Sequence, residues 1–366
     1  MASSHPMPHE LALTAAQQQV LLAQAPEADA QGTLLPSAIA LIHASGWLKM
    51  LAPAEVGGQA RALPEVVRLE EALCGTDGSC GWLVTLCAGA GWFSGFWPPA
   101  LAREVLATPQ LCLAGSGAPS GRAEREGAGW RISGHWHHAS GSQIATHYTF
   151  NAQLFEHGQP LRDASGLPRV CAFVVPAAQV QIEPGSWHSI GLRASTSCAF
   201  SVQQLWVPES QAFVIDAAHA QHPGPLYRFA FDALAWVTLS ACVLGMARQF
   251  IALAEPLCSR PLPHLGGPSA HLQALHGAHS QAVAAARETF YATLDAAWAQ
   301  VCAGRTLEAA QSAQLRECAL AVVQQAREAV DSLYPGCGLQ AADPRSHINR
   351  VWRDLHTASQ HVIWQR

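Results

Sequence analysis

Charged side chains are scarce in this sequence. Asp, Glu, Lys and Arg together make up 13% of its 366 residues, whereas soluble proteins usually carry about 25%. Fewer charges imply more buried surface, so we expect the chain to form a homo-oligomer. The formal net charge is -5 and no run of Lys or Arg is present, which argues against a surface for nucleic acid.

The eleven cysteines show no C-x-x-C pair and no regular spacing, and a chain of this size needs no disulfide framework. We interpret them as reduced thiols of a cytoplasmic protein. Residues Met1–Glu10 lack a basic region followed by an apolar one, so no signal peptide is expected. The most apolar segment, Ala233–Ala247, is too short for a bilayer and lies between Asp232 and Arg248. It is expected to be a buried helix rather than a membrane span.

A nicotinamide-binding fingerprint is also missing. Leu113–Pro119 is rich in Gly, but the spacing is wrong and no strand–helix–strand pattern follows, so we expect a loop there. A metal centre is not expected either. His135 and His137 could pair on a metal ion, but no carboxylate or thiolate stands at a matching spacing.

The sequence pattern changes twice along the chain. Residues 1–108 show mostly helical spacing, residues 109–212 show short alternating runs between Gly, Ser and Pro, and residues 225–366 contain long apolar-periodic segments. These patterns predict an α+β protein with an N-terminal helical domain, a middle antiparallel β-domain and a C-terminal helical domain. Trp92 and Phe93 belong to an aromatic cluster that either lines a substrate pocket or packs the core.

The stretch Gly129–Gly141 organises the middle region. It reads as two short strands with turns at Ser133-Gly134 and Ser140-Gly141. Alternation places Trp136 on the face opposite His135 and His137. A large indole beside a hydroxyl-bearing turn suits a flat aromatic ligand. The alternative is an ordinary hairpin with a buried Trp.

This stretch resembles the middle β-domain of the acyl-CoA dehydrogenase superfamily, where such a segment lies against a flavin. Its Ala-Ser-Gly ending is similar to that of the flavin monooxygenase branch, the oxygenase components of two-component hydroxylases. Two further segments resemble the superfamily: Trp187–Ser195, which matches its G-x-Arg-x-Ser/Thr pattern, and Val207-Pro208, which matches the exit from its sheet. The order of helical, β and helical regions agrees with the resemblance over nearly the whole chain.

The resemblance implies a C-terminal four-helix bundle, a homotetramer built on it, and a bound flavin, either FMN or FAD. In relatives, the region of Gly115 and Ser116 borders flavin and substrate, and the place of Arg260 touches the flavin phosphate. The segment Tyr334–Gly338 looks like a Gly-rich turn that approaches a neighbouring subunit's flavin, with Cys in place of one Gly. The flavin-binding residues that the resemblance implies are Trp136, Ser140, Gly141, Arg260, Gly336 and Gly338.

The last helix discriminates between two chemistries. Asp343-Pro344 is expected to start it, with Asp as the N-cap, and Arg353-Asp354 resembles the superfamily's Arg-Asp pair. Dehydrogenases carry a glutamate base about eight residues further on, whereas this chain has His361, as the monooxygenase branch does. His356 and His361 would differ by about 140° around a helix, so only one can face the ligand. The resemblance favours His361, and the alternative is that both are surface or interface histidines.

Together these residues predict a flavin-dependent monooxygenase. In such enzymes reduced flavin and O2 form a C4a-peroxyflavin that hydroxylates a small, often aromatic, substrate, and a separate flavin reductase supplies the reduced flavin. Ser140 would hydrogen-bond near the flavin N5, and His361 would act as the acid or base. Two alternatives remain open: an acyl-CoA dehydrogenase-like dehydrogenase or oxidase, and a non-catalytic flavin-binding protein.

Overall fold

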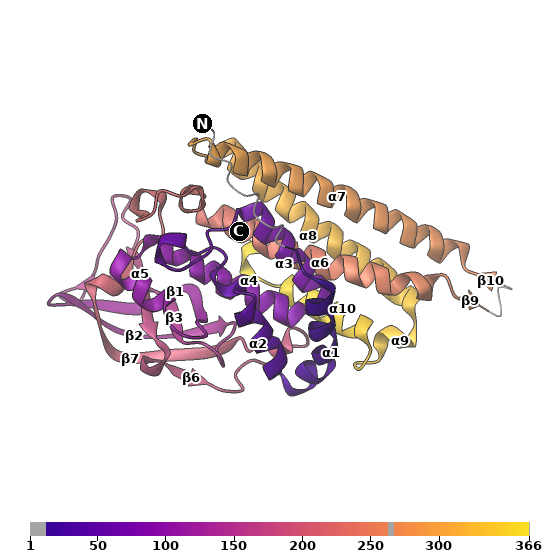
Figure 1. The fold of residues 1–366 in the computed structure, drawn as a ribbon, viewed down its shortest axis with the longest axis horizontal. Helices are drawn as coiled ribbons and strands as arrows, with labels where there is room; N and C mark the ends of the chain where they lie inside the picture. Colours follow the sequence, from indigo (N-terminus) through magenta and orange to yellow (C-terminus); the bar gives the residue numbers. More distant parts are fainter. Residues whose placement is uncertain (1–11, 263–266, 366) are drawn as a thin grey trace.

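The computed structural model describes residues 12–262 and 267–365, so the expectation for Met1–Glu10 lies outside the described residues. A sheet occupies one end of the molecule, and three long helices run away from it (Figure 1). Shorter helices from the N-terminal part lie between these two regions (Figure 1). They are α1 (Ala15–Gln31), α2 (Pro36–Ala44), α3 (Leu63–Thr76), α4 (Gly78–Trp92) and α5 (Pro99–Leu106).

Side-chain caps set the starts of two of these helices. Thr14 and Gln17 form a capping box at the start of α1, and Asp77 accepts from the Cys80 amide at the start of α4. The small residues of the α3 and α6 helices allow very close packing. A methyl group on Gly245 would meet the Glu71 carbonyl at 2.1 Å.

The eight-stranded sheet has the order β6-β7-β2-β1-β3-β5-β8, with β4 beside β3. The prediction of an antiparallel domain is wrong for one pair, because β1 and β3 run parallel. The expected loop at Leu113–Pro119 is also wrong, because that segment is the start of β1. A register shift between Ser116 and Gly121 accommodates its small residues. The strands are β1 (Leu113–Glu126), β2 (Gly129–Ala139), β3 (His147–Glu156), β4 (Gln159–Pro160), β5 (Val170–Pro176), β6 (Gln181–Glu183), β7 (Cys198–Pro208) and β8 (Ala212–Phe213).

The helical C-terminal region consists of α6 (Phe231–Cys258), α7 (Ala270–Cys302), α8 (Ala309–Cys337), α9 (Leu339–Ala342) and α10 (His347–Ala358), with a small hairpin of β9 (Pro261–Leu262) and β10 (Gly267–Pro268) between α6 and α7. The predicted α+β class is therefore confirmed. Helix α6 has 28 residues and is long and apolar enough to cross a membrane, so the length argument made from the sequence is wrong. Its most apolar window is 78% buried inside the protein, which confirms the expected buried helix.

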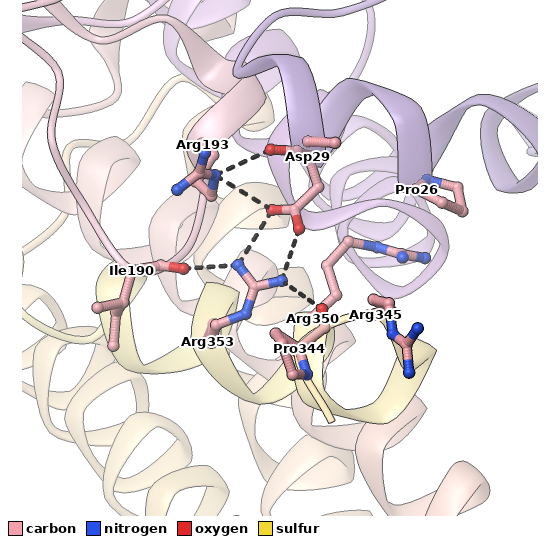
Figure 2. Close-up of a pocket in the computed structure, with 9 residues that line it drawn as sticks. Pro26, Asp29, Ile190, Arg193, Pro344, Arg345, Arg350 and Arg353 are labelled. Atoms are coloured by element: carbon pink, nitrogen blue, oxygen red, sulfur yellow. Dashed lines mark hydrogen bonds and ion pairs between the residues drawn. The ribbon is translucent and has the colours of Figure 1, made fainter. Parts of the chain in front are cut away.

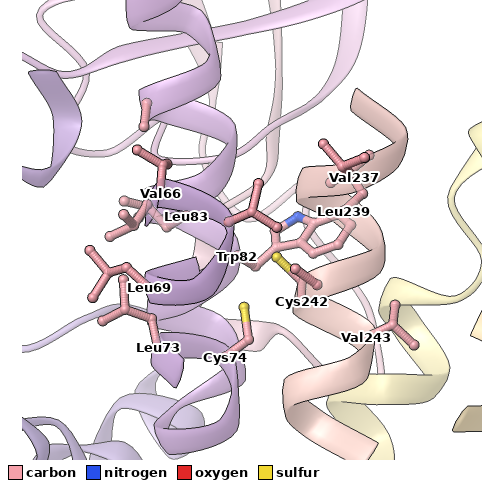
Figure 3. Close-up of a cluster of buried hydrophobic side chains, with 14 of the residues drawn as sticks. Val66, Leu69, Leu73, Cys74, Trp82, Leu83, Val237, Leu239, Cys242 and Val243 are labelled. Atoms are coloured by element: carbon pink, nitrogen blue, oxygen red, sulfur yellow. The ribbon is translucent and has the colours of Figure 1, made fainter. Parts of the chain in front are cut away.

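Helix α4 lies at the centre of the packing. Its Trp82 extends toward α6, where Leu239 and Cys242 lie close to the indole, and α3 contributes Leu69 and Cys74 to the same apolar cluster (Figure 3). A second core lies within the sheet and contains Trp136, Phe150 and Phe200. The opposite face of α4 contacts the turn that follows β2, so this helix connects the two regions.

Candidate functional site

The turn after β2 brings Ser140 and Gly141 against helix α4. Ser140 is buried, and its carbonyl oxygen accepts a weak hydrogen bond from the Cys87 thiol at 3.5 Å. Gly141 has φ +78, a left-handed conformation that favours glycine. A methyl group there would lie 2.9 Å from the Cys87 sulfur and 3.3 Å from the Cys112 sulfur. Glycine is therefore required at this turn both for its conformation and for space.

Three serine hydroxyls form a buried chain that ends at Ser140. Ser140 Oγ lies 2.8 Å from Ser197 Oγ, Ser197 Oγ lies 2.8 Å from Ser195 Oγ, and Ser195 Oγ donates to the Leu192 carbonyl at 2.7 Å. Each hydroxyl has one proton to donate. Because the Leu192 carbonyl can only accept, the Ser195 hydroxyl donates its proton to it. Ser197 must therefore donate to Ser195, and Ser140 must donate to Ser197. Ser140 is left with a lone pair to offer a ligand.

Helix α10 holds the loop that carries this chain. The Leu192 amide donates to Asp354 Oδ1 at 2.5 Å, and the Gly191 amide donates to Thr357 Oγ1 at 3.0 Å. Leu192 and Thr196 both have positive φ without being glycine, a conformation that costs free energy and persists only where surroundings fix it. The Arg353-Asp354 pair found in the sequence thus positions the hydroxyl chain.

Asp354 is fully enclosed at this junction. Burial raises its pKa to about 7, with the nearby Asp77 and Asp29 acting in the same direction, against the Leu192 amide and Arg353. This burial was not predictable from the sequence, where the carboxylate stands out only as half of a family motif. Its role in the structure is to accept the backbone hydrogen bond that orders the loop.

Trp136, predicted to lie against a ligand, lies in the core of the sheet. It is completely buried, packs between the Phe150 and Phe200 rings, and donates from Nε1 to the Ala118 and Asn151 carbonyls. The alternation expected along β2 breaks at a register shift after Trp136, where His138 has φ +65. The indole therefore acts as a packing residue in this structure.

His361 does not lie on the last helix. Helix α10 ends at Ala358, so the angular argument that compared His356 with His361 does not apply. Asp343 is also not the N-cap: Ser346 caps α10 by accepting from the Asn349 amide. The His361 ring instead meets Trp82 of α4 edge-on, with ring centroids 6.0 Å apart. Its Nδ1 accepts from the Ile363 amide at 3.3 Å, which leaves the proton of the neutral ring on Nε2.

The surroundings of His356 differ from those of His361. Its ring packs on Trp352 at 4.4 Å between centroids, and its Nε2 lies 3.1 Å from the Asp331 carboxylate on α8. Burial lowers the pKa of His356, with Asp331 opposing that shift. These contacts place His356 between α8 and α10, where it supports packing. His361 and the Ser140 turn, by contrast, both contact α4.

Arg260 lies between α6 and β9, and Gly338 lies between α8 and α9. A methyl group on Gly338 would lie 2.7 Å from Arg260 Nη2. The predicted Gly-rich turn is wrong for Gly336, which lies inside α8 against Leu272, whereas Gly338 ends that helix with φ +66.

The residues predicted to line a substrate pocket are mostly packed against their neighbours. Trp92 is buried, donates from Nε1 to the Leu226 carbonyl and contacts Phe93 and Phe96. Phe93 is partly exposed. Gly115 and Ser116 are partly exposed on β1, and a methyl group on Gly115 would collide with the Thr149 carbonyl at 2.2 Å. Within the described residues, no three His, Cys, Asp or Glu side chains gather to hold a metal ion.

Comparisons with known proteins give consistent results. Residues 237–366 match a family described as acyl-CoA dehydrogenase, C-terminal domain. The chain is similar to the pigment production hydroxylase of Rhodococcus erythropolis, at 24% identity over 354 residues that cover 94% of this chain and 89% of the relative. It is also similar to the FADH2-dependent resorcinol hydroxylase, oxygenase component, of Rhizobium sp., at 25% identity over 354 residues, covering 89% and 83%. The structure of XiaF from Streptomyces sp., in complex with FADH2 and glycerol, has a TM-score of 0.85 at 22% identity and covers 95% of this chain and 89% of that one.

Proposed function

We propose that this chain, a member of the acyl-CoA dehydrogenase superfamily by its fold and its C-terminal region, is the oxygenase component of a two-component flavin-dependent monooxygenase. The resemblance predicted from the sequence is confirmed by the family match and by relatives that are hydroxylases. The same relatives support a flavin-dependent oxidoreductase that uses reduced flavin. The finer proposal is hydroxylation of a small aromatic substrate.

The direction of the serine hydroxyl chain carries this proposal. Ser140 donates toward Ser197 and therefore presents a lone pair to any ligand beside the turn. Reduced flavin bears a hydrogen on N5 and can donate to such a lone pair, whereas oxidised N5 can only accept. A hydroxyl chain fixed by the Leu192 carbonyl thus matches the reduced cofactor. Gly141 lets the turn pack directly on Cys87, Cys112 and Leu83, which holds Ser140 in place at the end of the chain.

When bound, reduced flavin supplies the activation of O2, and the protein supplies position, protons and exclusion of water. The turn lies against buried small and apolar side chains of α4, including Leu83 and Cys87. An apolar surround slows unproductive loss of a reactive oxygen species to water. In this proposal Ser140 orients the flavin N5, which corresponds to its predicted role.

His361 is the proposed acid or base. Its Nδ1 accepts from the Ile363 amide, and in this proposal the imidazole exchanges a proton with a substrate hydroxyl. Imidazole performs this exchange near neutral pH. The Trp82 contact places the ring beside α4, the same helix that contacts the Ser140 turn. Trp136, Gly115, Ser116 and the Trp92 cluster take no direct chemical part in this proposal.

Partners and location follow as further proposals. A separate reductase would deliver reduced flavin, and a homotetramer would bring Arg260 and Gly338 of one subunit to the flavin of another. All eleven cysteines are described and unpaired, which agrees with a cytoplasmic protein.

Anaerobic titration with reduced FMN and reduced FAD, followed by rapid mixing with O2 and a panel of phenols and fused aromatics, tests the function. We expect tight binding of one reduced flavin, weaker binding of the oxidised form, and oxygenated product from at least one aromatic. Tight binding of oxidised flavin that an acyl-CoA bleaches would establish the dehydrogenase alternative instead. No binding of either redox state would indicate a non-catalytic protein.

A further inference from the structure

A second site lies on the other side of the loop that carries the serine chain. A cavity of about 490 Å³ opens between α1, the loop at Ile190 and the start of α10 (Figure 2). Four arginines and one aspartate line it, together with prolines, an alanine and an isoleucine. The charged lining residues are Arg193, Arg345, Arg350, Arg353 and Asp29. None of the residues predicted for flavin or substrate belongs to this set.

Three of the four arginines have partners among the described residues. Arg353 donates to both Asp29 carboxylate oxygens, at 3.0 and 2.6 Å, and also to the Asn349 side chain and the Ile190 carbonyl. Arg345 on the rim pairs with Asp343. Arg193 donates from Nε to the Asp29 backbone carbonyl at 2.8 Å, and the same nitrogen lies 3.9 Å from Asp29 Oδ1. Asp29 is therefore shared between Arg353 and Arg193 and cannot neutralise the whole pocket.

Arg350 is the exception. Its side chain is only 7% exposed and makes no hydrogen bond or ion pair within the described residues. Its nitrogens are not among the fully buried side-chain atoms that lack a hydrogen bond, so the guanidinium reaches the cavity that it lines. Figure 2 shows its guanidinium extending away from the Asp29 pair into the space between Pro26 and Arg345. Asp77 interacts electrostatically with Arg350, but its carboxylate already accepts hydrogen bonds from the Gln24 side chain and the Cys80 amide.

The charge of the cavity lining is unbalanced. Guanidinium cannot lose its proton within the range of physiological pH, and a buried charge is tolerated when a counter-charge and hydrogen bonds compensate for lost water. Four arginines and one carboxylate, that of Asp29, line the cavity. The donors of an arginine form a planar fork that matches the oxygens of phosphate, so the excess positive charge suits an anionic ligand.

We propose that this pocket binds a small phosphate monoester, whose phosphate is held by Arg350 and Arg193 and whose organic part rests on Pro26, Ile190 and Pro344. The volume exceeds what inorganic phosphate fills and lies within the range of about 300–1,000 Å³ typical of small-molecule sites. The site is separate from the proposed flavin turn and does not depend on the monooxygenase function.

Calorimetric titration of the flavin-free protein with phenyl phosphate at constant ionic strength tests this inference. Benzoate provides the carboxylate comparison and sodium chloride the non-specific one. We expect saturable one-to-one binding of phenyl phosphate, weaker binding of benzoate and none of chloride. Arg350→Gln should weaken phenyl phosphate binding by about tenfold or more, since it removes a charge-assisted fork.

Arg169→Gln is the matched control, because Arg169 is exposed near the edge strands of the sheet and lines no part of the cavity. Its affinity should equal that of the unmodified protein. If Arg350→Gln fails to fold, Arg193→Gln replaces it, since that side chain is 45% exposed. Equal weakening by Arg169→Gln, no saturable binding, or preference for benzoate would overturn the proposal. Binding that appears only after dilution has separated the subunits would also overturn it. In that case a carboxylate of a second copy would occupy the pocket in the undiluted oligomer.

Discussion

The two sides of the loop from Ile190 to Ser197 differ in how their polar groups are satisfied. On one side, Ser195, Ser197 and Ser140 are neutral, buried and linked in a single direction by the Leu192 carbonyl. On the other side, Arg193 and Arg350 are charged and line a cavity in which Asp29 is the one carboxylate. A neutral hydroxyl chain with a fixed direction favours a ligand that donates a hydrogen bond to it. A cationic pocket favours a ligand with negative charge. The same loop therefore presents two kinds of selectivity.

The largest expected loss of activity comes from removal of the His361 side chain. His361→Ala should lower product formation by roughly 10²–10⁴-fold, the usual share of general acid–base catalysis. Binding of reduced flavin should change little, because in this proposal Ser140 and not His361 contacts the flavin. Product yield and peroxide released per reduced flavin consumed provide the measurement.

His356→Ala is the control for that variant, since His356 lies between Trp352 and Asp331. It should reduce stability and leave the rate per folded molecule unchanged. A loss of product with His356→Ala but not with His361→Ala would remove His361 from the proposed site.

Asp354 lies at the junction of the two sides, and Asp354→Asn should change how the free energy of unfolding depends on pH. Burial raises the pKa of Asp354 to about 7, above about 3.9 in an unfolded chain. The folded protein thus holds the proton more tightly, and this contribution to the free energy of unfolding is fully present below about pH 4 and lost as pH rises through 7. Urea unfolding should show a decline of roughly 1–4 kcal/mol across that window that is absent in Asp354→Asn.

The asparagine can still accept from the Leu192 amide, so the comparison isolates the titration from the hydrogen bond. Parallel pH profiles for the two proteins would mean that Asp354 does not titrate in this window.

Ser140→Ala would remove the ligand end of the hydroxyl chain. Losing one hydrogen bond at the reacting centre should cost on the order of 1–3 kcal/mol, which we expect to appear as more peroxide and less product. Ser142→Ala is a suitable control, because its hydroxyl donates to the Thr196 carbonyl at the same turn and stands outside the chain. Unchanged coupling in Ser140→Ala would argue against a flavin at this turn.

Ser195→Ala has the smallest expected effect and the most specific one. Without Ser195, Ser197 loses its fixed acceptor and can donate to Ser140, which then donates to the ligand. The preference for reduced over oxidised flavin should fall by about two- to tenfold, the equivalent of one net hydrogen bond. Affinities for the two redox states, measured by fluorescence titration under nitrogen, test this. An unchanged ratio would contradict the directional role of the chain.

The sequence was sufficient for the order of regions and the Ser140-Gly141 turn, because local patterns determine those features. The predicted turn at Ser133-Gly134 is wrong, since β2 runs unbroken through it. The sequence failed where tertiary packing overrides local preference. Trp136 has the alternation of a ligand-facing residue, but Phe150 and Phe200 enclose it. The Gly-rich start of β1 reads as a loop, but pairing with β3 makes it a strand.

The end of α10 could not be placed from the sequence either. The angular comparison of His356 and His361 assumed that the helix continues to His361, whereas α10 stops at Ala358. The serine chain was partly visible: Ser195 stood within a recognised motif, but its distance to Ser140 depends on how the loop docks against α10. Arg350 gave no signal, since an arginine in an amphipathic helix is ordinary until its surroundings are known.

Leu192 and Thr196, the two non-glycine residues with left-handed backbone, have a consequence for local opening of the protein. Each holds a conformation that costs about 1–3 kcal/mol and would relax once its constraints are released. The constraints come from α10, through the amides of Gly191 and Leu192. Fraying of the C-terminal helix therefore disorders the serine loop as well, and both segments should exchange their amide hydrogens as one cooperative unit.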